Sequence, residues 1–204
     1  MLIIWLYQGI EICVAARISR SYCGDWIARE QPARVVAMDA FWIDRTEVTN
    51  EQYQKCVDAG ACLASNYEDV NESDYNGAAQ PVVGIDWHNA KAYCEWVGAK
   101  LPTEAQWEYA ARGINDHMYP WGDTALTCEL ANYLGCGHKT LPVGSFPDGA
   151  SWVGALDMAG NVWEWVADWY GSYMGVAQTN PVGPTSGTFK VLSLIHISEP
   201  TRPY

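Results

Sequence analysis

The sequence has few basic residues. It contains 12 Lys and Arg against 24 Asp and Glu, which gives a formal net charge of −12 over 204 residues. Such an excess of acid repels phosphate backbones and anionic membrane surfaces, so we expect no nucleic-acid partner. Most of the acids are expected to lie on the surface, because acidic side chains are seldom buried. The alternative is that some of them coordinate a hard cation.

Long hydrophobic runs are also missing. The chain opens on MLIIWLYQGIEIC, where Gln8 and Glu11 interrupt the apolar stretch, well short of the roughly 20 residues that span a bilayer. No basic segment precedes this stretch, as it would in a secretory signal peptide. We therefore predict no membrane span and no clear signal peptide.

Histidine is scarce, and its spacing excludes common metalloenzyme motifs. The four histidines, His88, His117, His138 and His196, form no HEXXH motif, and a facial triad cannot be built from adjacent residues. The sequence shows no phosphate loop, activated nucleophile or acid/base pair either. From the residues alone, no catalytic constellation is expected.

The seven cysteines include no CxxC motif, so zinc and thioredoxin-type chemistry are poorly supported. Two pairs are close in sequence, Cys56 with Cys62 and Cys128 with Cys136. We predict that each forms a local disulfide worth about 2–3 kcal/mol. Disulfides favour an oxidising, extracytoplasmic compartment. The alternative is that these cysteines are reduced, buried thiols.

The length suits one domain with a core of its own, and local patterns predict three helices. The capping box at Thr49 (TNEQ) predicts a helix over 50–59. The capping box at Thr103 (TEAQ) predicts another, which continues up to Gly113. Asp86 can cap a third helix, in which apolar residues recur at helical spacing until Gly98. Short strands are expected at 35–44 and 161–168, and the region after Tyr119 is rich in turns. The fold class is therefore α+β.

Five motifs follow one another along the chain: FWIDRTEVTNEQY at 41–53, PVVGIDWHNAKAYCEWVGAKLPTEAQWEYAARG at 81–113, YPWGD at 119–123, LPVGSFP at 141–147 and GALDMAGNVWEWVADWY at 154–170. In their order, spacing and residues, these motifs resemble those of the formylglycine-generating-enzyme, or sulfatase-modifying-factor, family. A single motif such as PWG would be a weak signal. Five in sequence are a specific one.

The resemblance implies a fold distantly related to C-type lectins, with little regular secondary structure and stabilising calcium. Carried over by position, the calcium ligands would be the side chains of Asp157 and Glu164 and the carbonyls of Gly160 and Val162. These are hard oxygen donors, as calcium requires. The alternatives are a turn-forming role for Asp157 and an exposed strand position for Glu164.

Two further roles come from the same resemblance. A second calcium would use Asn132 and the carbonyl of Tyr133, but the segment that follows, LGCGHKT, has no aspartate in register. This favours a turn amide at Asn132. Trp163 lies where relatives place a tryptophan near a substrate groove, although tryptophan is more often simply buried.

The ends of the chain depart from the family pattern. Residues 1–28 are an off-pattern segment, 29–192 match an incomplete sulfatase-modifying-factor-like domain, and 193–204 resemble an artefactual tail translated from adapter sequence. We therefore expect the family's C-terminal part to be missing.

The missing part bears on activity. Relatives with oxidase activity bind copper through two cysteines near that end and convert a sulfatase cysteine to formylglycine. The first hypothesis is thus a fragment of such an oxidase. The second is a non-catalytic, calcium-stabilised extracytoplasmic module with a protein or peptide ligand, which the cysteine pairs favour. The histidine spacing argues against the iron-dependent sulfoxide synthases that contain a similar domain.

Overall fold

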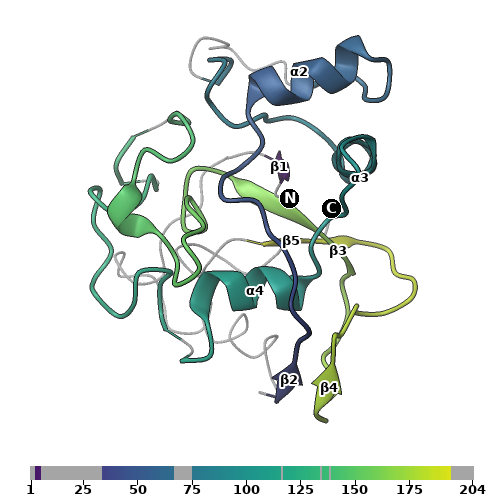
Figure 1. The fold of residues 1–204 in the computed structure, drawn as a ribbon, viewed down its shortest axis with the longest axis vertical. Coiled ribbons are helices and arrows are strands. Elements are labelled where there is room, and N and C mark those ends of the chain that lie inside the picture. Colours follow the sequence, from purple (N-terminus) through teal and green to yellow (C-terminus); the bar gives the residue numbers. More distant parts are fainter. Residues whose placement is uncertain are drawn as a thin grey trace.

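The computed structural model describes residues 3–5, 34–66, 75–115, 117–133, 135–137 and 139–193. Figure 1 shows helices arranged around a small central sheet, with long irregular connections between the elements. In chain order the elements are β1 (Ile3–Trp5), β2 (Val36–Ala37), α2 (Asn50–Asp58), α3 (Trp87–Trp96), α4 (Glu104–Arg112), η3 (Pro147–Gly149), β3 (Trp163–Trp169), β4 (Gln178–Thr179) and β5 (Lys190–Ser193).

The three helices begin where the capping residues predict. Thr49 and Thr103 each form a complete capping box, with Gln52 and Gln106 as the respective partners. Asp86 accepts the N–H of Asn89 at 2.8 Å and so caps α3. Such caps satisfy backbone donors that the first helical turn leaves unpaired, and each contributes about 1 kcal/mol.

The central sheet has the order β1-β3-β5, and both pairings are antiparallel. A separate parallel pair joins β2 to β4, with Val36 opposite Gln178. The prediction of a strand over 35–44 was therefore too long: only Val36 and Ala37 form a strand, and residues 38–44 have no regular secondary structure. The strand predicted at 161–168 corresponds to β3, shifted by one or two residues at its ends.

Strands β3 and β5 separate two hydrophobic clusters. Trp165 and Leu192 belong to the cluster that includes α2 and α3, whereas Val166 and Val191 belong to the one that includes α4. In Figure 1, α2 and α3 accordingly lie on the opposite side of β3 from α4. A strand covered on both faces can bury a residue at nearly every position, and this explains the burial along β3.

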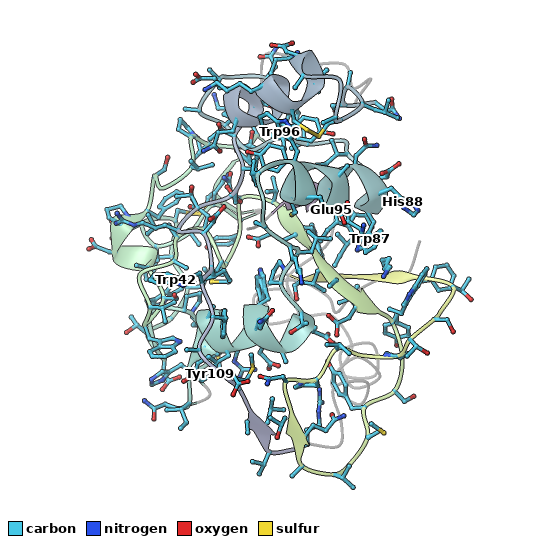
Figure 2. All side chains as sticks on the ribbon, turned by 45° about the vertical axis from the view of Figure 1, so that its right-hand side comes forward. Trp42, Trp87, His88, Glu95, Trp96 and Tyr109 are labelled. Atoms are coloured by element: carbon cyan, nitrogen blue, oxygen red, sulfur yellow. A yellow bond between two sulfur atoms is a disulfide. The ribbon has the colours of Figure 1, made fainter. Side chains whose placement is uncertain are left out.

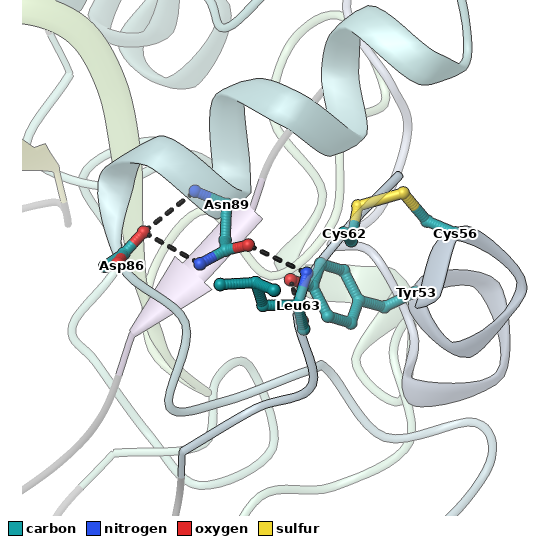
Figure 3. The surroundings of a disulfide bond; sticks show 6 residues. All are labelled: Tyr53, Cys56, Cys62, Leu63, Asp86 and Asn89. Atoms are coloured by element: carbon teal, nitrogen blue, oxygen red, sulfur yellow. Dashed lines mark hydrogen bonds between the residues drawn. A yellow bond between two sulfur atoms is a disulfide. The ribbon is translucent and has the colours of Figure 1, made fainter. Parts of the chain in front are cut away.

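Both predicted disulfides are present. Cys56–Cys62 closes the end of α2, and Cys128–Cys136 closes the turn around Tyr133. Around the first bond, Leu63 is also held by its backbone: its N–H donates to Asn89 Oδ1 at 3.0 Å, and its carbonyl accepts the Tyr53 hydroxyl at 2.9 Å (Figure 3). The disulfide thus fixes a segment that links α2 to α3.

Several aromatic side chains remain at the surface. Figure 2 labels Trp42 and Trp96, which are 100% and 41% exposed, and Tyr109, whose carbonyl accepts the indole N–H of Trp152.

Across the described residues, none of the helices has the length and apolar character needed to cross a bilayer.

Candidate functional site

The loop that leads into β3 has an unusual backbone. Asp157 and Asn161 adopt positive φ values of 59° and 58°, and Gly160 has a φ of 103°. A Cβ on Gly160 would lie 2.3 Å from the carbonyl oxygen of Asn132, so only glycine fits. The N–H of Asn161 donates to that same carbonyl at 2.7 Å. The GNVWEW motif therefore begins with a tight loop, which packs against the backbone of Asn132.

The two predicted carboxylate ligands are both buried at this loop. Glu164 is 0% exposed and Asp157 is 7% exposed. Asp157 Oδ2 accepts the N–H of Gly144 at 2.5 Å, and Glu164 Oε2 accepts the indole N–H of Trp107 at 2.6 Å. The alternative that placed Glu164 on an exposed strand face is wrong, because its side chain is fully buried and bonded to Trp107 of α4.

A third carboxylate, that of Glu47, lies beside them and was missed in the sequence. Its side chain is 1% exposed, and Oε2 accepts the side-chain N–H of Asn161 at 2.7 Å. The backbone N–H of Val162, which donates to the Gly160 carbonyl at 2.8 Å, opposes part of the rise in the pKa of this carboxyl group. Glu47 stands two residues before the Thr49 cap, and its motif was interpreted only as a helix start.

The three carboxyl groups disfavour one another's ionisation. Burial raises the pKa of Glu47 well above its ordinary value, and the charges of Asp157 and Glu164 raise it further. Burial likewise raises the pKa of Glu164 to about 8 and raises that of Asp157. Among the described residues, no Lys or Arg pairs with any of the three. A bound cation would reverse this balance by favouring the ionised forms.

The donor set fits the chemistry of calcium, although the ligand geometry stays a prediction. Oε1 of Glu47 and Oε1 of Glu164 are buried and have no hydrogen-bond partner in the described structure. Carboxylate oxygens without partners are suitable calcium ligands. Within the described ranges, no group of three or more His, Cys, Asp or Glu side chains is placed to hold a metal ion. The predicted set needs only two such side chains, because Gly160 and Val162 would contribute carbonyls.

The residues of the second predicted calcium site take part in local structure. Asn132 is 8% exposed, and its side-chain N–H groups donate to the Lys139 carbonyl at 2.9 Å and to Asn161 Oδ1 at 3.2 Å. The carbonyl of Tyr133 accepts the N–H of Cys136 at 2.8 Å. Asn132 thus connects two loops, and a metal role for this pair stays a prediction.

Trp163 lies at the start of β3, where it is half-buried and packs against the cluster of α2 and α3. Its assignment to a substrate groove likewise stays a prediction.

A separate acidic pair lies where α4 begins. Asp168 Oδ2 accepts the N–H of Glu104 at 2.8 Å, and Glu104 Oε1 accepts the hydroxyl of Tyr173 at 2.9 Å. Burial raises the pKa of Glu104 to about 7. Nothing in the local sequence marked Glu104, because a glutamate in the first turn of a helix is ordinarily exposed.

The fold defines the class of the protein. The chain superposes on the solved structure of Treponema denticola variable protein 1 with a TM-score of 0.61 and 25% identity, covering 77% of this chain and 73% of that one. This neighbour has the C-type-lectin-like fold, with limited regular secondary structure.

Sequence comparison then gives the family. The profile of the sulfatase-modifying factor enzyme 1-like domain matches residues 14–193, and the chain belongs to this family. It is 30% identical over 218 residues to the formylglycine-generating enzyme of Mus musculus, covering 79% of this chain and 58% of the relative. It is 34% identical over 202 residues to the hercynine oxygenase of Mycolicibacterium thermoresistibile, covering 80% of this chain and 45% of the relative. The chain thus spans less than two thirds of either relative.

Proposed function

We propose that this domain is a calcium-stabilised, non-catalytic binding module that works outside the cytoplasm on a protein or peptide ligand. The observation that carries the proposal is the group of buried carboxylates around the GNVWEW loop. Buried charges are ordinarily paired or coordinate a metal, and Glu47 and Glu164 each have a buried oxygen without a described partner. Asp157, Glu164 and the carbonyls of Gly160 and Val162 would hold the ion, whose charge would offset their repulsion.

The two disulfides support the location. Cys56–Cys62 and Cys128–Cys136 both close short loops, and such bonds persist mainly in oxidising compartments. An extracytoplasmic module can also rely on calcium, which is abundant there relative to the affinity of extracellular sites.

Thermal unfolding with and without calcium tests the proposal. A ligand at about 100 times its Kd stabilises the native state by about 2.7 kcal/mol, which for a chain of this size raises Tm by about 5–11 °C. We expect EGTA to remove this gain and Asp157→Ala to abolish the response. Asp148→Ala, at an exposed acid in η3, is the control and should respond like wild type. A wild-type Tm that ignores both calcium and EGTA would contradict the proposal.

The second candidate is a fragment of a copper-dependent oxidase, and the similarity to a formylglycine-generating enzyme favours it. Copper in such enzymes would need two thiolates. Among the described residues only Cys94 is unbonded; it is buried, and burial raises the pKa of its thiol to about 12. A lone buried thiol of this kind does not fit a two-thiolate site.

A peptide assay separates the two candidates. We expect a Cys-x-Pro-x-Arg peptide, incubated with this chain, copper and oxygen, to keep its mass. Formation of formylglycine in that peptide, detected by mass spectrometry, would overturn the non-catalytic assignment in favour of the oxidase.

A further inference from the structure

The two described disulfides differ in their access to solvent. Cys56 is 0% exposed and Cys62 is 7% exposed, and both belong to the cluster that includes α2 and α3. In the second bond, Cys128 is exposed and Cys136 is half-buried. A thiolate must reach a sulfur atom before it can exchange with a disulfide. The folded chain therefore presents Cys128–Cys136 to a dissolved thiol and protects Cys56–Cys62.

The exposed bond encloses the residue that supports the GNVWEW loop. Asn132 lies midway between Cys128 and Cys136 in the sequence. Its carbonyl accepts the N–H of Asn161 at 2.7 Å, and its side chain donates to Asn161 Oδ1 at 3.2 Å. Gly160 approaches the same carbonyl so closely that a Cβ would lie 2.3 Å from the oxygen. Any loosening of Asn132 should therefore affect Gly160 and Asn161 first.

The two halves of this turn are held differently. On the Cys128 side, Ala131 is 2% exposed and packs in the cluster that includes α4. On the Cys136 side, the described backbone contact is the bond from the N–H of Cys136 to the Tyr133 carbonyl at 2.8 Å. A disulfide restricts the chain that it closes. Opening it should free the second half of the turn, while Ala131 keeps the first half in the core.

The thiol that opens this bond has to come from another molecule. Among the described residues, Cys94 is the one unbonded cysteine, and it is buried in the cluster that includes α2 and α3. Burial raises the pKa of its thiol to about 12, so almost none of it is the thiolate that performs exchange. Ala131, three residues after Cys128, belongs to the other cluster.

We propose that Cys128–Cys136 is a site of thiol–disulfide exchange and that its reduction loosens the GNVWEW loop. The co-reactant is a dithiol. One of its thiolates attacks Sγ of the exposed Cys128, the protein S–S bond breaks, and Cys136 leaves as a thiolate that takes up a proton. The second thiolate of the reductant attacks its own sulfur in the mixed disulfide and releases Cys128. The protein disulfide is thereby reduced to two thiols, and the dithiol is oxidised to its disulfide.

This role of the bond does not require calcium, because it depends on the contact of Asn132 with Gly160 and Asn161. Exposed disulfides are typically the more easily reduced ones. The redox state of Cys128–Cys136 would therefore set how firmly the GNVWEW loop is held, whatever the loop binds.

Site-resolved reduction of the folded, full chain tests the exchange site. Brief treatment with dithiothreitol is followed by alkylation with iodoacetamide and peptide mass mapping, which gives a rate for each cysteine. We expect Cys128 and Cys136 to be alkylated at least about tenfold faster than Cys56 and Cys62, because a buried bond reacts only after local opening. Equal rates, or faster reduction of Cys56–Cys62, would overturn the assignment.

Hydrogen exchange tests the link to the loop. In the double variant Cys128→Ala and Cys136→Ala, we expect the N–H of Asn161 to exchange about tenfold faster than in wild type. The N–H of Tyr53 in α2, which donates to the Thr49 carbonyl at 2.9 Å, should keep its wild-type rate. Wild type that is folded first, and then reduced and alkylated at Cys128 and Cys136, gives the same measurement without refolding a variant.

The matched control removes the other bond, in the double variant Cys56→Ala and Cys62→Ala. It should speed exchange in α2, which Cys56 closes, and leave Asn161 at its wild-type rate. Opposite effects of this kind support the proposal. An unchanged rate at Asn161 after the loss of Cys128–Cys136, or an equal rise at Asn161 and Tyr53, overturns the link between the bond and the loop.

Discussion

The indole N–H of Trp107 donates to Oε2 of Glu164 at 2.6 Å, which joins α4 to β3 inside the domain. This bond is the one described donor to a carboxyl group that is completely buried. Trp107 therefore both fills the cluster on the α4 side of the sheet and holds a predicted metal ligand.

Trp107→Phe should destabilise the domain by about 2–4 kcal/mol, because it leaves Glu164 without its donor and leaves space in the core. Urea unfolding measures the loss. Trp42→Phe is the matched control, since Trp42 is fully exposed, and it should stay within about 0.5 kcal/mol of wild type. Equal effects of the two substitutions would contradict the importance of the Trp107–Glu164 bond.

Gly160→Ala should be among the most destabilising single changes in the loop. The new Cβ would lie 2.3 Å from the Asn132 carbonyl oxygen, in addition to occupying a φ of 103°. We expect a loss of about 3 kcal/mol or more in urea unfolding, together with a weaker response to calcium.

Gly98→Ala separates the two causes of that loss. Gly98 also has a positive φ, of 75°, but a Cβ there meets nothing within 4 Å. It should cost only the conformational penalty of about 1–2 kcal/mol. Losses of the same size at both positions would show that the contact with Asn132 is unimportant.

Removal of the Cys56–Cys62 bond, in the double variant Cys56→Ala and Cys62→Ala, should lower the free energy of unfolding by about 2–3 kcal/mol. The fold should survive, because Leu63 keeps its bonds to Tyr53 and Asn89. Guanidinium unfolding measures the change.

A reductant should lower the free energy of unfolding of this variant by less than that of wild type, since only Cys128–Cys136 remains to be broken among the described bonds. Equal reductant costs would mean that the first bond contributes nothing.

The elements that could be predicted from the sequence are those that local chemistry determines. The capping boxes at Thr49 and Thr103 place both helix starts to the residue, and closely spaced cysteines form the two bonds. The parallel pairing of Val36 with Gln178 could not be predicted, because two paired residues far apart in the chain leave no periodic pattern. The same reason limits the strand predicted at 35–44.

Burial of acids was the least predictable property of the site. The motif match marked Asp157 and Glu164, but Glu47 carries no local sign of burial, since it is one acid among many in an acidic chain. Its environment is created by Asn161 and Val162, more than a hundred residues away. Sequence patterns predict which residues share an element, whereas the meeting of three carboxylates depends on how loops from different parts of the chain pack.

The acidic pair at the start of α4 predicts a pH dependence of stability. Burial raises the pKa of Glu104 from 4.5 to about 7, against the hydrogen bond from Tyr173. Between these two values the folded chain keeps a proton that the unfolded chain has lost. The contribution of this group is therefore complete below the unfolded value and is lost as pH rises through about 7.

Glu104→Gln cannot ionise, so we expect its urea midpoint to match wild type near pH 4 and to exceed it at about pH 8, less a small loss of favourable charge at the helix N-terminus. Glu51→Gln, at an exposed acid in the first turn of α2, should show no such divergence. Parallel pH profiles for Glu104→Gln and wild type would mean that Glu104 titrates normally in the folded domain.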